Sequence, residues 1–483
     1  MPVSPDLVDH SSPNRWTLVA IAMAVVSAGI MGVFLLRIPI QLSDSYTEFQ
    51  SVYEGSLMDT LRSQFQAGPY LRPFRRGLIK VVYELSGGNY QPWFRGFQVA
   101  QLLVLLLLVV GALRVRTKAA AAMVPVTLAM VLGIHTFSGA ILEGLPINHF
   151  LTILICCAAA INLSRARPSW LVDIAAVVLL VFAMLTIESG LVVAAVLVAS
   201  YLVGYRGVSV WAVGAVVLTV GVYAYGRFVW LGGSTPDLGE RSAGFGFRVL
   251  DTGELIRRFG PNPLPFYLYN FVSAISAVLF AEPRGGVWVF VDTVLRGRIE
   301  LWRLITVVSS TAMTGVLLAF AAQRLGRWRR GVFDSDADRM VVIFAGVLLG
   351  NAVFAFAYAK DAILGPAGLF YALAASAVLQ QFVTGVAGLR LPHRALAFAM
   401  TIVACGWSIR LMGIHYSLQV REGSTRNEWA YYEEWERKQH FEEPFTAMET
   451  QILNALRRQA IRGGSRVRRA PNGLADRVFD ITQ

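Results

Sequence analysis

The chain has 483 residues and a net charge of +12; 55% of its residues are hydrophobic and only 15% are charged. A soluble domain carries about a quarter charged residues, so this composition excludes an ordinary soluble enzyme and indicates an integral membrane protein. The basic residues stand in short clusters between apolar runs. That distribution is typical of loops beside anionic lipid and argues against a nucleic-acid-binding protein.

Apolar runs long enough to be membrane spans follow one another along most of the chain. A span needs roughly 20 apolar residues. The first run, 16–36, lacks a small-residue cleavage site, so we expect a retained transmembrane helix rather than a cleaved signal. The stretch 266–299 can either span or re-enter. The sequence therefore predicts an all-α integral membrane protein with about 11 to 13 transmembrane helices. The remaining runs are 96–113, 119–137, 148–164, 170–187, 190–205, 208–230, 301–322, 340–358, 363–383 and 393–413.

The basic loops indicate how these spans are oriented. Loops on the positive side of a membrane protein are usually cytoplasmic. The opposite side then carries the first long loop, 37–95, and a polar tail, 414–483. We expect residues 1–413 to form one polytopic domain, with interfacial helices in the loop 37–95. The tail 414–483 is predicted to be mostly helical, extracytoplasmic and dispensable for chemistry. The basic loops that share one side are 114–118, 164–168, 204–207, 323–330 and 390–394.

Ionisable residues of the predicted outer face lie at the ends of different spans. Asp44 and Glu48 come directly after the first span. A charge within a span costs about 2.5–3.5 kcal/mol on insertion scales, so charged residues kept at such positions are candidates for function. The other candidates on this face are Arg72, Arg75, Glu143, His149, Glu188, Lys360 and Asp361.

Each of these residues also has a purely structural interpretation. Asp44 can cap an interfacial helix over residues 45–66, and Glu48 is more simply an exposed charge on that helix. Glu188 can be the solvated tip of a tight turn between two spans. The arginines can bind lipid headgroups whatever the function.

The sequence has no histidine or cysteine pattern typical of a zinc site. The run 334–338, "DSDAD", begins like a calcium loop but has Arg339 where such a loop has glycine, so we expect it to cap the following helix. The three cysteines lie inside apolar runs and are predicted to be reduced packing residues. No cofactor is expected, and a requirement for a divalent metal stays open.

Four features occur in a recognisable order. Asp44 closely follows the first span, and "YLRPF" (70–74) follows in the same loop. "LTIESG" (185–190) forms a hairpin tip, and "YAKDAILGPAGLFYALA" (358–374) enters a late span. Together they resemble the GT-C superfamily of polytopic glycosyltransferases, which includes lipid A aminoarabinose transferases and protein O-mannosyltransferases. The tip resembles the family's Leu-x-Lys-Glu-x-Gly pattern, although Ile187 stands in place of the lysine.

The resemblance implies an inverting hexosyl- or pentosyltransferase that uses a polyprenyl-phosphate sugar, with Asp44 as general base and the other outer-face candidates in substrate binding. The residue types suit that chemistry, because a carboxylate can take a proton from an acceptor hydroxyl. Arg72, Arg75 or Lys360 can hold the phosphate, and Ile187 puts one phosphate contact in doubt. The acceptor would be an envelope lipid, glycan or protein.

Residue composition indicates the source of the chain. Only four of the 43 lysines and arginines are lysine, which indicates a high-GC bacterium. We therefore expect the protein in the plasma (inner) membrane, with the site facing the exterior.

Two other functions stay open. One is a lipid or polysaccharide transporter or flippase, and the other is a non-catalytic subunit of an envelope assembly. A transporter is expected to hold ionisable residues near the middle of several spans. The predicted spans lack ionisable residues near their middle. The ionisable residues gather instead at the outer ends of the spans, which favours the enzyme over the transporter.

Overall fold

The structure is a computed structural model that describes most of the chain. Two of the candidate residues, Asp44 and Glu143, lie outside the described residues. The described residues are 14–42, 48–65, 71–142, 146–231, 243–244, 248–249, 251–281, 287–297, 301–356, 359–385, 393–430 and 446–462.

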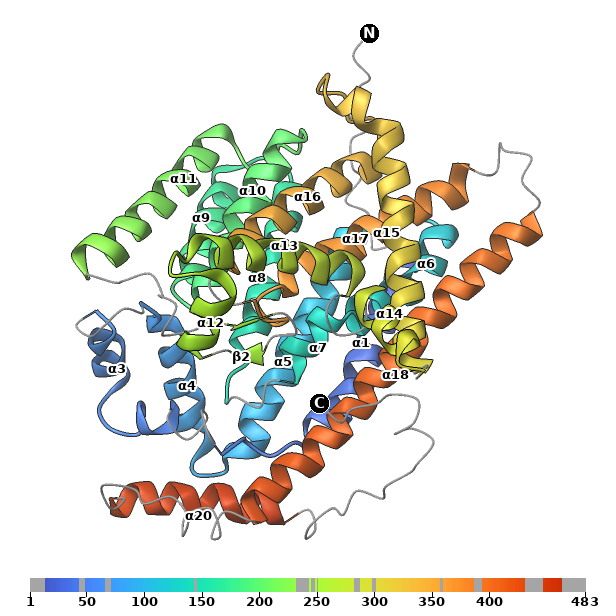
Figure 1. The fold of residues 1–483 in the computed structure, drawn as a ribbon. Coiled ribbons are helices and arrows are strands. Elements are labelled where there is room, and N and C mark those ends of the chain that lie inside the picture. Colours follow the sequence, from blue (N-terminus) through green and yellow to red (C-terminus); the bar gives the residue numbers. More distant parts are fainter. Residues whose placement is uncertain are drawn as a thin grey trace.

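The described part of the chain is almost entirely helical (Figure 1). A two-residue antiparallel pair, β1 (Ala243–Gly244) with β2 (Arg248–Val249), is the exception. The predicted all-α class is confirmed, and each predicted apolar run contains a helix. The helices are α1 (Arg15–Leu35), α3 (Leu57–Ser63), α4 (Pro73–Ser86), α5 (Tyr90–Leu113), α6 (Lys118–Gly133), α7 (His135–Ile141), α8 (His149–Ser164), α9 (Trp170–Met184), η1 (Glu188–Leu191), α10 (Val192–Leu202), α11 (Val210–Tyr225), η2 (Gly226–Trp230), α12 (Thr252–Phe259), α13 (Leu264–Phe280), α14 (Val287–Leu295), α15 (Leu301–Trp328), α16 (Asp336–Phe354), α17 (Gly365–Gly385), α18 (His393–Ala430) and α20 (Ala447–Ile461).

Within the described ranges, six helices are long and apolar enough to cross a membrane, or up to eight if each of two bent pairs counts as one span. The bent pairs are α6 with α7, at 64°, and α12 with α13, at 90°. This number is lower than the 11 to 13 expected. Three predicted runs fold as the shorter apolar helices α8, α9 and η1–α10, and a fourth, 393–413, lies in α18, which is not among the candidate spans of the described residues. The ambiguous stretch 266–299 becomes the second arm of a bent pair followed by α14. These helices define a multi-pass membrane protein.

Four of the basic loops gather at one end of the helix bundle. Asn14 Nδ2, at the start of α1, donates to the carbonyl of Arg116 just after α5 (2.7 Å). Arg165, after α8, pairs with Asp336 at the start of α16, and the Tyr205 hydroxyl donates to the same carboxylate. Trp328, in the loop 323–330, donates through Nε1 to Asp338 in the first turn of α16 (2.9 Å). The shared side predicted for loops 114–118, 164–168, 204–207 and 323–330 is therefore seen, whereas residues 390–392 of the fifth loop lie outside the described residues. We call this the basic-loop end. The opposite end, where α1 ends and α5 begins, is the first-loop end.

The tail packs onto the first loop. Figure 1 shows α18 running from the bundle down to α20, which lies across the same side of the molecule as α3 and α4. A hydrophobic cluster at this place joins Phe49 and Val52 of the first loop to Trp429 and Ile452 of the tail. The tail is thus built into the first-loop end rather than standing apart from it.

Candidate functional site

The first loop docks onto the tip between α9 and η1. Pro73 occupies the first turn of α4, where its missing N–H costs nothing. The next residue, Phe74, donates its backbone N–H to the carbonyl of Leu185 (3.2 Å), and its ring lies 5.3 Å from that of Phe182. These contacts bring the "YLRPF" stretch against the "LTIESG" stretch, although more than 100 residues separate them.

Arg72 and Glu188 form an ion pair at this junction. Arg72 donates through Nε to both carboxylate oxygens of Glu188 (3.1 Å each) and through Nη2 to Oε2 (2.6 Å). The two side chains are 16% and 18% exposed, so Glu188 is a half-buried, paired carboxylate rather than a freely solvated tip. A guanidinium that grips both oxygens is among the stronger charge-assisted arrangements.

A second arginine, which the sequence interpretation missed, faces the same carboxylate. Arg227 lies in η2, at the end of α11, and its Nη1 is 3.7 Å from Glu188 Oε1. Its side chain is 12% exposed. The signal was available, because Arg227 is a charged residue near the end of the apolar run 208–230, where such a charge is costly. Arg227 therefore places a second positive charge beside the Glu188 carboxylate.

The tight turn between α9 and η1 requires a glycine at position 190. A Cβ at this position would lie 2.2 Å from the carbonyl oxygen of Ala183 and 2.7 Å from the nitrogen of Met184. Both partners are backbone atoms and cannot move aside cheaply. The Gly190 N–H also donates to the carbonyl of Ile187 (2.8 Å). A residue without a side chain is therefore needed for the turn that holds Glu188 at the end of α9.

Glu48 and Arg75 form a second ion pair across the first loop. Their side chains are only 17% and 13% exposed, so the interpretation of Glu48 as an exposed helix-face charge is wrong. Burial lowers the pKa of the Arg75 guanidinium, and the Glu48 carboxylate partly offsets this effect. An arginine nevertheless keeps its charge at neutral pH. The pair fixes Glu48, four residues after Asp44, beside the start of α4.

The interfacial helix expected over 45–66 is interrupted. Residues 48–50 are helical, but residues 51–56 form turns, with Gly55 at a φ of 72°. The helix α3 then starts from its own cap, in which Ser56 and Asp59 satisfy each other's backbone N–H groups. This capping box begins a new helix, so the described part of the first loop holds short helices rather than one long one.

His149 and Lys360 lie close to the two arginines. The His149 side chain is buried at the first turn of α8, and within the described ranges its Nδ1 has no hydrogen-bond partner. The positive charges of Arg75, Arg72 and Lys360 all act on this imidazole. Lys360 Nζ lies 5.7 Å from the Phe150 ring, which packs 4.3 Å from the His149 ring. Residues predicted separately from the first loop, α8 and the segment before α17 are thus brought together.

Asp361 is buried in the turn that leads into α17. The close approach of α7 holds it there, since a Cβ on Gly139 would lie 2.5 Å from the Cβ of Asp361. Asp44 and Glu143 are the two candidates that lie outside the described residues. In the described part of the chain, no group of three or more histidine, cysteine, aspartate or glutamate side chains is arranged to hold a metal ion.

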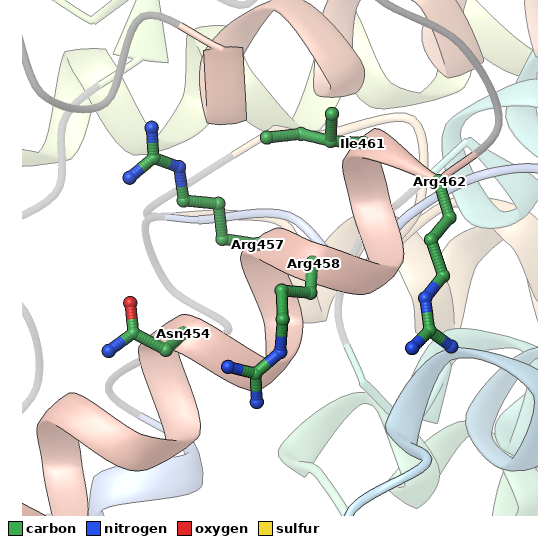
Figure 2. Close-up of a pocket in the computed structure, with 5 residues that line it drawn as sticks. All are labelled: Asn454, Arg457, Arg458, Ile461 and Arg462. Carbon is green, nitrogen blue, oxygen red and sulfur yellow. The ribbon is translucent and has the colours of Figure 1, made fainter.

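A hollow of about 440 Å³ lies elsewhere at the first-loop end, on the outer side of α20. Figure 2 shows the side chains that line it, which project from successive turns of this one helix. Three of the five are arginines and none is acidic, so the hollow is a basic surface separate from the Arg72–Glu188 pair. Its lining residues are Asn454, Arg457, Arg458, Ile461 and Arg462.

The fold and the charged cluster define an all-helical multi-pass membrane protein with an arginine-rich site at one end. Comparison with protein-family models, with curated proteins and with solved structures found no match to this chain.

Proposed function

We propose that this protein is an integral-membrane glycosyltransferase of the GT-C type. It would transfer a sugar from a polyprenyl-phosphate donor to a cell-envelope acceptor on the extracytoplasmic face, with inversion at the anomeric carbon. The observation that carries the proposal is the junction of the first loop with the α9–η1 tip, where Arg72, Glu188 and Arg227 meet.

The chemistry requires a base and a place for a phosphate. The acceptor oxygen attacks the anomeric carbon, its proton passes to a carboxylate, and the bond from the anomeric carbon to the phosphate oxygen breaks with its electron pair on the phosphate. Asp44 is the proposed base. A chain extends by at most about 3.6 Å per residue, so Asp44 stays within about 14 Å of Glu48 in any conformation.

The arginines suit the departing phosphate. Arg72, Arg75 and Arg227 come from two distant parts of the chain, and their side chains are between 12% and 16% exposed. Partial burial strengthens electrostatic interactions relative to water, and preorganised donors stabilise charge that develops in the transition state. Glu188 then keeps Arg72 and Arg227 in place. Lys360 and His149, which lie on either side of Phe150, are the further proposed substrate contacts, together with Asp361 in the turn before α17.

Replacement of Asp44 tests the proposal. Asp44→Asn keeps the size of the side chain and most of its capping capacity but cannot accept the proton. Loss of a general base typically lowers a rate by about 10²–10⁴-fold, whereas loss of a helix cap costs only about 1 kcal/mol of stability. The variant should therefore insert and fold like the parent and be almost inactive. Glu48→Gln, which keeps a hydrogen-bond acceptor for Arg75, should be much milder.

The measurement is sugar transfer by purified protein in lipid nanodiscs. A panel of polyprenyl-phosphate sugars serves as donor, and an envelope extract from cells that lack the protein serves as acceptor. Transfer by Asp44→Asn at close to the parental rate would remove Asp44 from catalysis. Absence of transfer by the parental protein with every donor would reject the proposed activity.

A further inference from the structure

The helix α20 turns an arginine-rich side away from the protein. Its apolar residues, among them Ile452 and Leu456, are buried in the cluster that joins the tail to the first loop and α5. Such spacing places them on one side of the helix. The hollow of about 440 Å³ shown in Figure 2 lies on the other side. Because the apolar side is covered by the protein itself, the polar side is the one that can meet a partner.

The hollow is positively charged. Arg458 and Arg462 are exposed, and none of the five side chains that line the hollow is acidic. Glu449, the acid of this helix, is occupied at the opposite end, where it caps the first turn and accepts a hydrogen bond from Gln50. Guanidinium groups bind phosphate oxygens through paired, charge-assisted hydrogen bonds. The hollow therefore suits a phosphate-bearing partner.

The last turn of α20 is fixed to the start of a membrane-spanning helix. Gln459 donates through Nε2 to the carbonyl of Gly88 (2.7 Å), and its Oε1 accepts the backbone N–H of Gln91 (2.9 Å). These residues flank the start of α5, which is a candidate span. Gln459 directly follows Arg458, so the hollow lies beside the point where α5 enters the membrane.

The same turn is also tied to the end of another span. The Ala460 carbonyl accepts from Nη1 of Arg426 (2.9 Å), and Nη2 of this arginine donates to the carbonyl of Arg37 (3.3 Å). Arg37 comes just after α1, which is the first candidate span. Two spans that end at one level therefore mark the position of the last turn of α20 relative to the bilayer.

That level corresponds to the lipid headgroups. The hydrocarbon core of a bilayer is about 30 Å thick and the whole bilayer about 40–45 Å, which leaves about 5–8 Å for each headgroup layer. The 24 residues of α5 extend about 36 Å at 1.5 Å per residue, slightly more than the core. The first turn of α5, to which Gln459 is bonded, therefore lies among headgroups, and so do the neighbouring arginines.

We propose that the α20 hollow, lined by Asn454, Arg457, Arg458, Ile461 and Arg462, binds the phosphate headgroup of an anionic phospholipid in the leaflet at the first-loop end. The headgroup is held by arginines, in contrast to an interfacial helix that inserts its own apolar side into the bilayer. A zwitterionic headgroup carries its own cation beside the phosphate, so the arginines select an anionic one. An arginine near an anionic surface strengthens binding by about fivefold.

The test places a photoreactive group in the hollow. Ile461, which is 36% exposed, is replaced by p-benzoylphenylalanine, so that one bulky apolar side chain stands in for another. The whole protein is placed in nanodiscs of equal parts phosphatidylglycerol and phosphatidylcholine and irradiated, and its adducts are identified by mass spectrometry. Phosphatidylglycerol adducts should outnumber phosphatidylcholine adducts by at least about fivefold.

Three variants of this photoreactive protein locate the source of the preference. Arg458→Gln/Arg462→Gln should still label lipid but with the two adducts close to equal. Arg458→Lys/Arg462→Lys keeps the charge and should keep most of the preference. The matched control is Arg62→Gln/Arg257→Gln, which removes the same charge from exposed positions in α3 and α12 and should label like the parent.

Cationic residues in a last turn also offset the helix dipole, and the experiment separates this structural role from lipid binding. A purely structural role predicts equal labelling of the two lipids in the parent, or an unchanged preference in Arg458→Gln/Arg462→Gln; either result overturns the proposal. So does an equal loss of preference in the control variant, or adducts to glycan or protein without lipid. If the double glutamine variant aggregates in size-exclusion chromatography, the single variants decide, and each should lose about fivefold in preference. Sugar transfer is not measured, so the result is independent of the proposed function.

Discussion

The two ends of the bundle both gather arginines and carboxylates, yet they use them differently. At the basic-loop end the acids close helix ends and join loops. Asp338 caps α16 together with Ser335 and accepts a hydrogen bond from Trp328 Nε1 (2.9 Å). Asp336 forms an ion pair with Arg165 and accepts a hydrogen bond from the Tyr205 hydroxyl. These contacts connect loops that lie next to one another at this end and stabilise the start of α16.

At the first-loop end the charges converge on one place. Arg72 and Arg227 both face the Glu188 carboxylate, and Arg75, in the same loop as Arg72, pairs with Glu48. Arginines that gather around partly buried carboxylates suit an anionic substrate, and this supports the proposal that the substrate site lies at the first-loop end.

Among variants that compare the two ends, the largest effect is expected from a matched replacement of one arginine at each end. Arg72→Lys keeps the charge but loses the two-pronged geometry of the guanidinium. It should lower kcat for sugar transfer by about 10²–10³-fold, the cost of losing one well-placed donor. Arg165→Lys, at the basic-loop end, should leave the rate per folded molecule unchanged. Equal losses in the two variants would show that the ends do not differ in function.

The next comparison concerns one glycine at each end, Gly190 and Gly207, where a Cβ would clash with a backbone carbonyl oxygen. A Cβ on Gly190 would lie 2.2 Å from the carbonyl oxygen of Ala183, and one on Gly207 would lie 2.3 Å from that of Leu163. Overpacking of this kind costs about 1–3 kcal/mol or more, so both alanine variants should unfold at lower temperature in a size-exclusion assay after heating.

The kcat of the molecules that remain folded distinguishes these two variants. Only Gly190→Ala should lower it, because Glu188 lies two residues away. Gly29→Ala is the control for both, since open space surrounds its Cβ. Unchanged stability in Gly190→Ala would contradict the geometry of the tip.

The smallest effect is expected at an ion pair whose side chains are both well exposed. Asp334 and Arg327 pair at the basic-loop end, with 40% and 47% of their side chains exposed. Exposed pairs contribute about 0–1 kcal/mol, so Asp334→Asn should change the free energy of unfolding by no more than that and leave transfer intact. A larger loss of stability in a denaturant titration would contradict this prediction and show that the Asp334–Arg327 pair helps to hold the loops together.

Local features of the sequence predicted much of the fold. Apolar length predicted the positions of the helices, and the basic loops predicted which connections share an end. The cap expected from "DSDAD" is present, because Ser335 and Asp338 satisfy each other's N–H groups at the start of α16. Each of these signals depends on residues within a few positions of one another, which is the range over which helix caps and spans are determined.

Arg410 shows where that reasoning failed. The prediction that the spans are free of ionisable residues is wrong for the run 393–413, because Arg410 is 1% exposed within the bundle. It donates to the carbonyl of Gly133 (3.2 Å) and to the hydroxyls of Ser309 (3.1 Å) and Ser310 (2.8 Å). The bend between α6 and α7 leaves that carbonyl at a helix end, where an external donor is needed.

By itself the sequence determined the membrane class, the helices, the shared end of the basic loops and a set of candidate residues at the other end. Only the tertiary structure decided that Arg227 faces Glu188, that Glu48 pairs with Arg75 and that Trp429 holds the carbonyl of Ile40. These contacts join residues from 27 to 389 positions apart. Their formation depends on how helices pack and bend, and no local pattern of residues encodes a partner at such a distance.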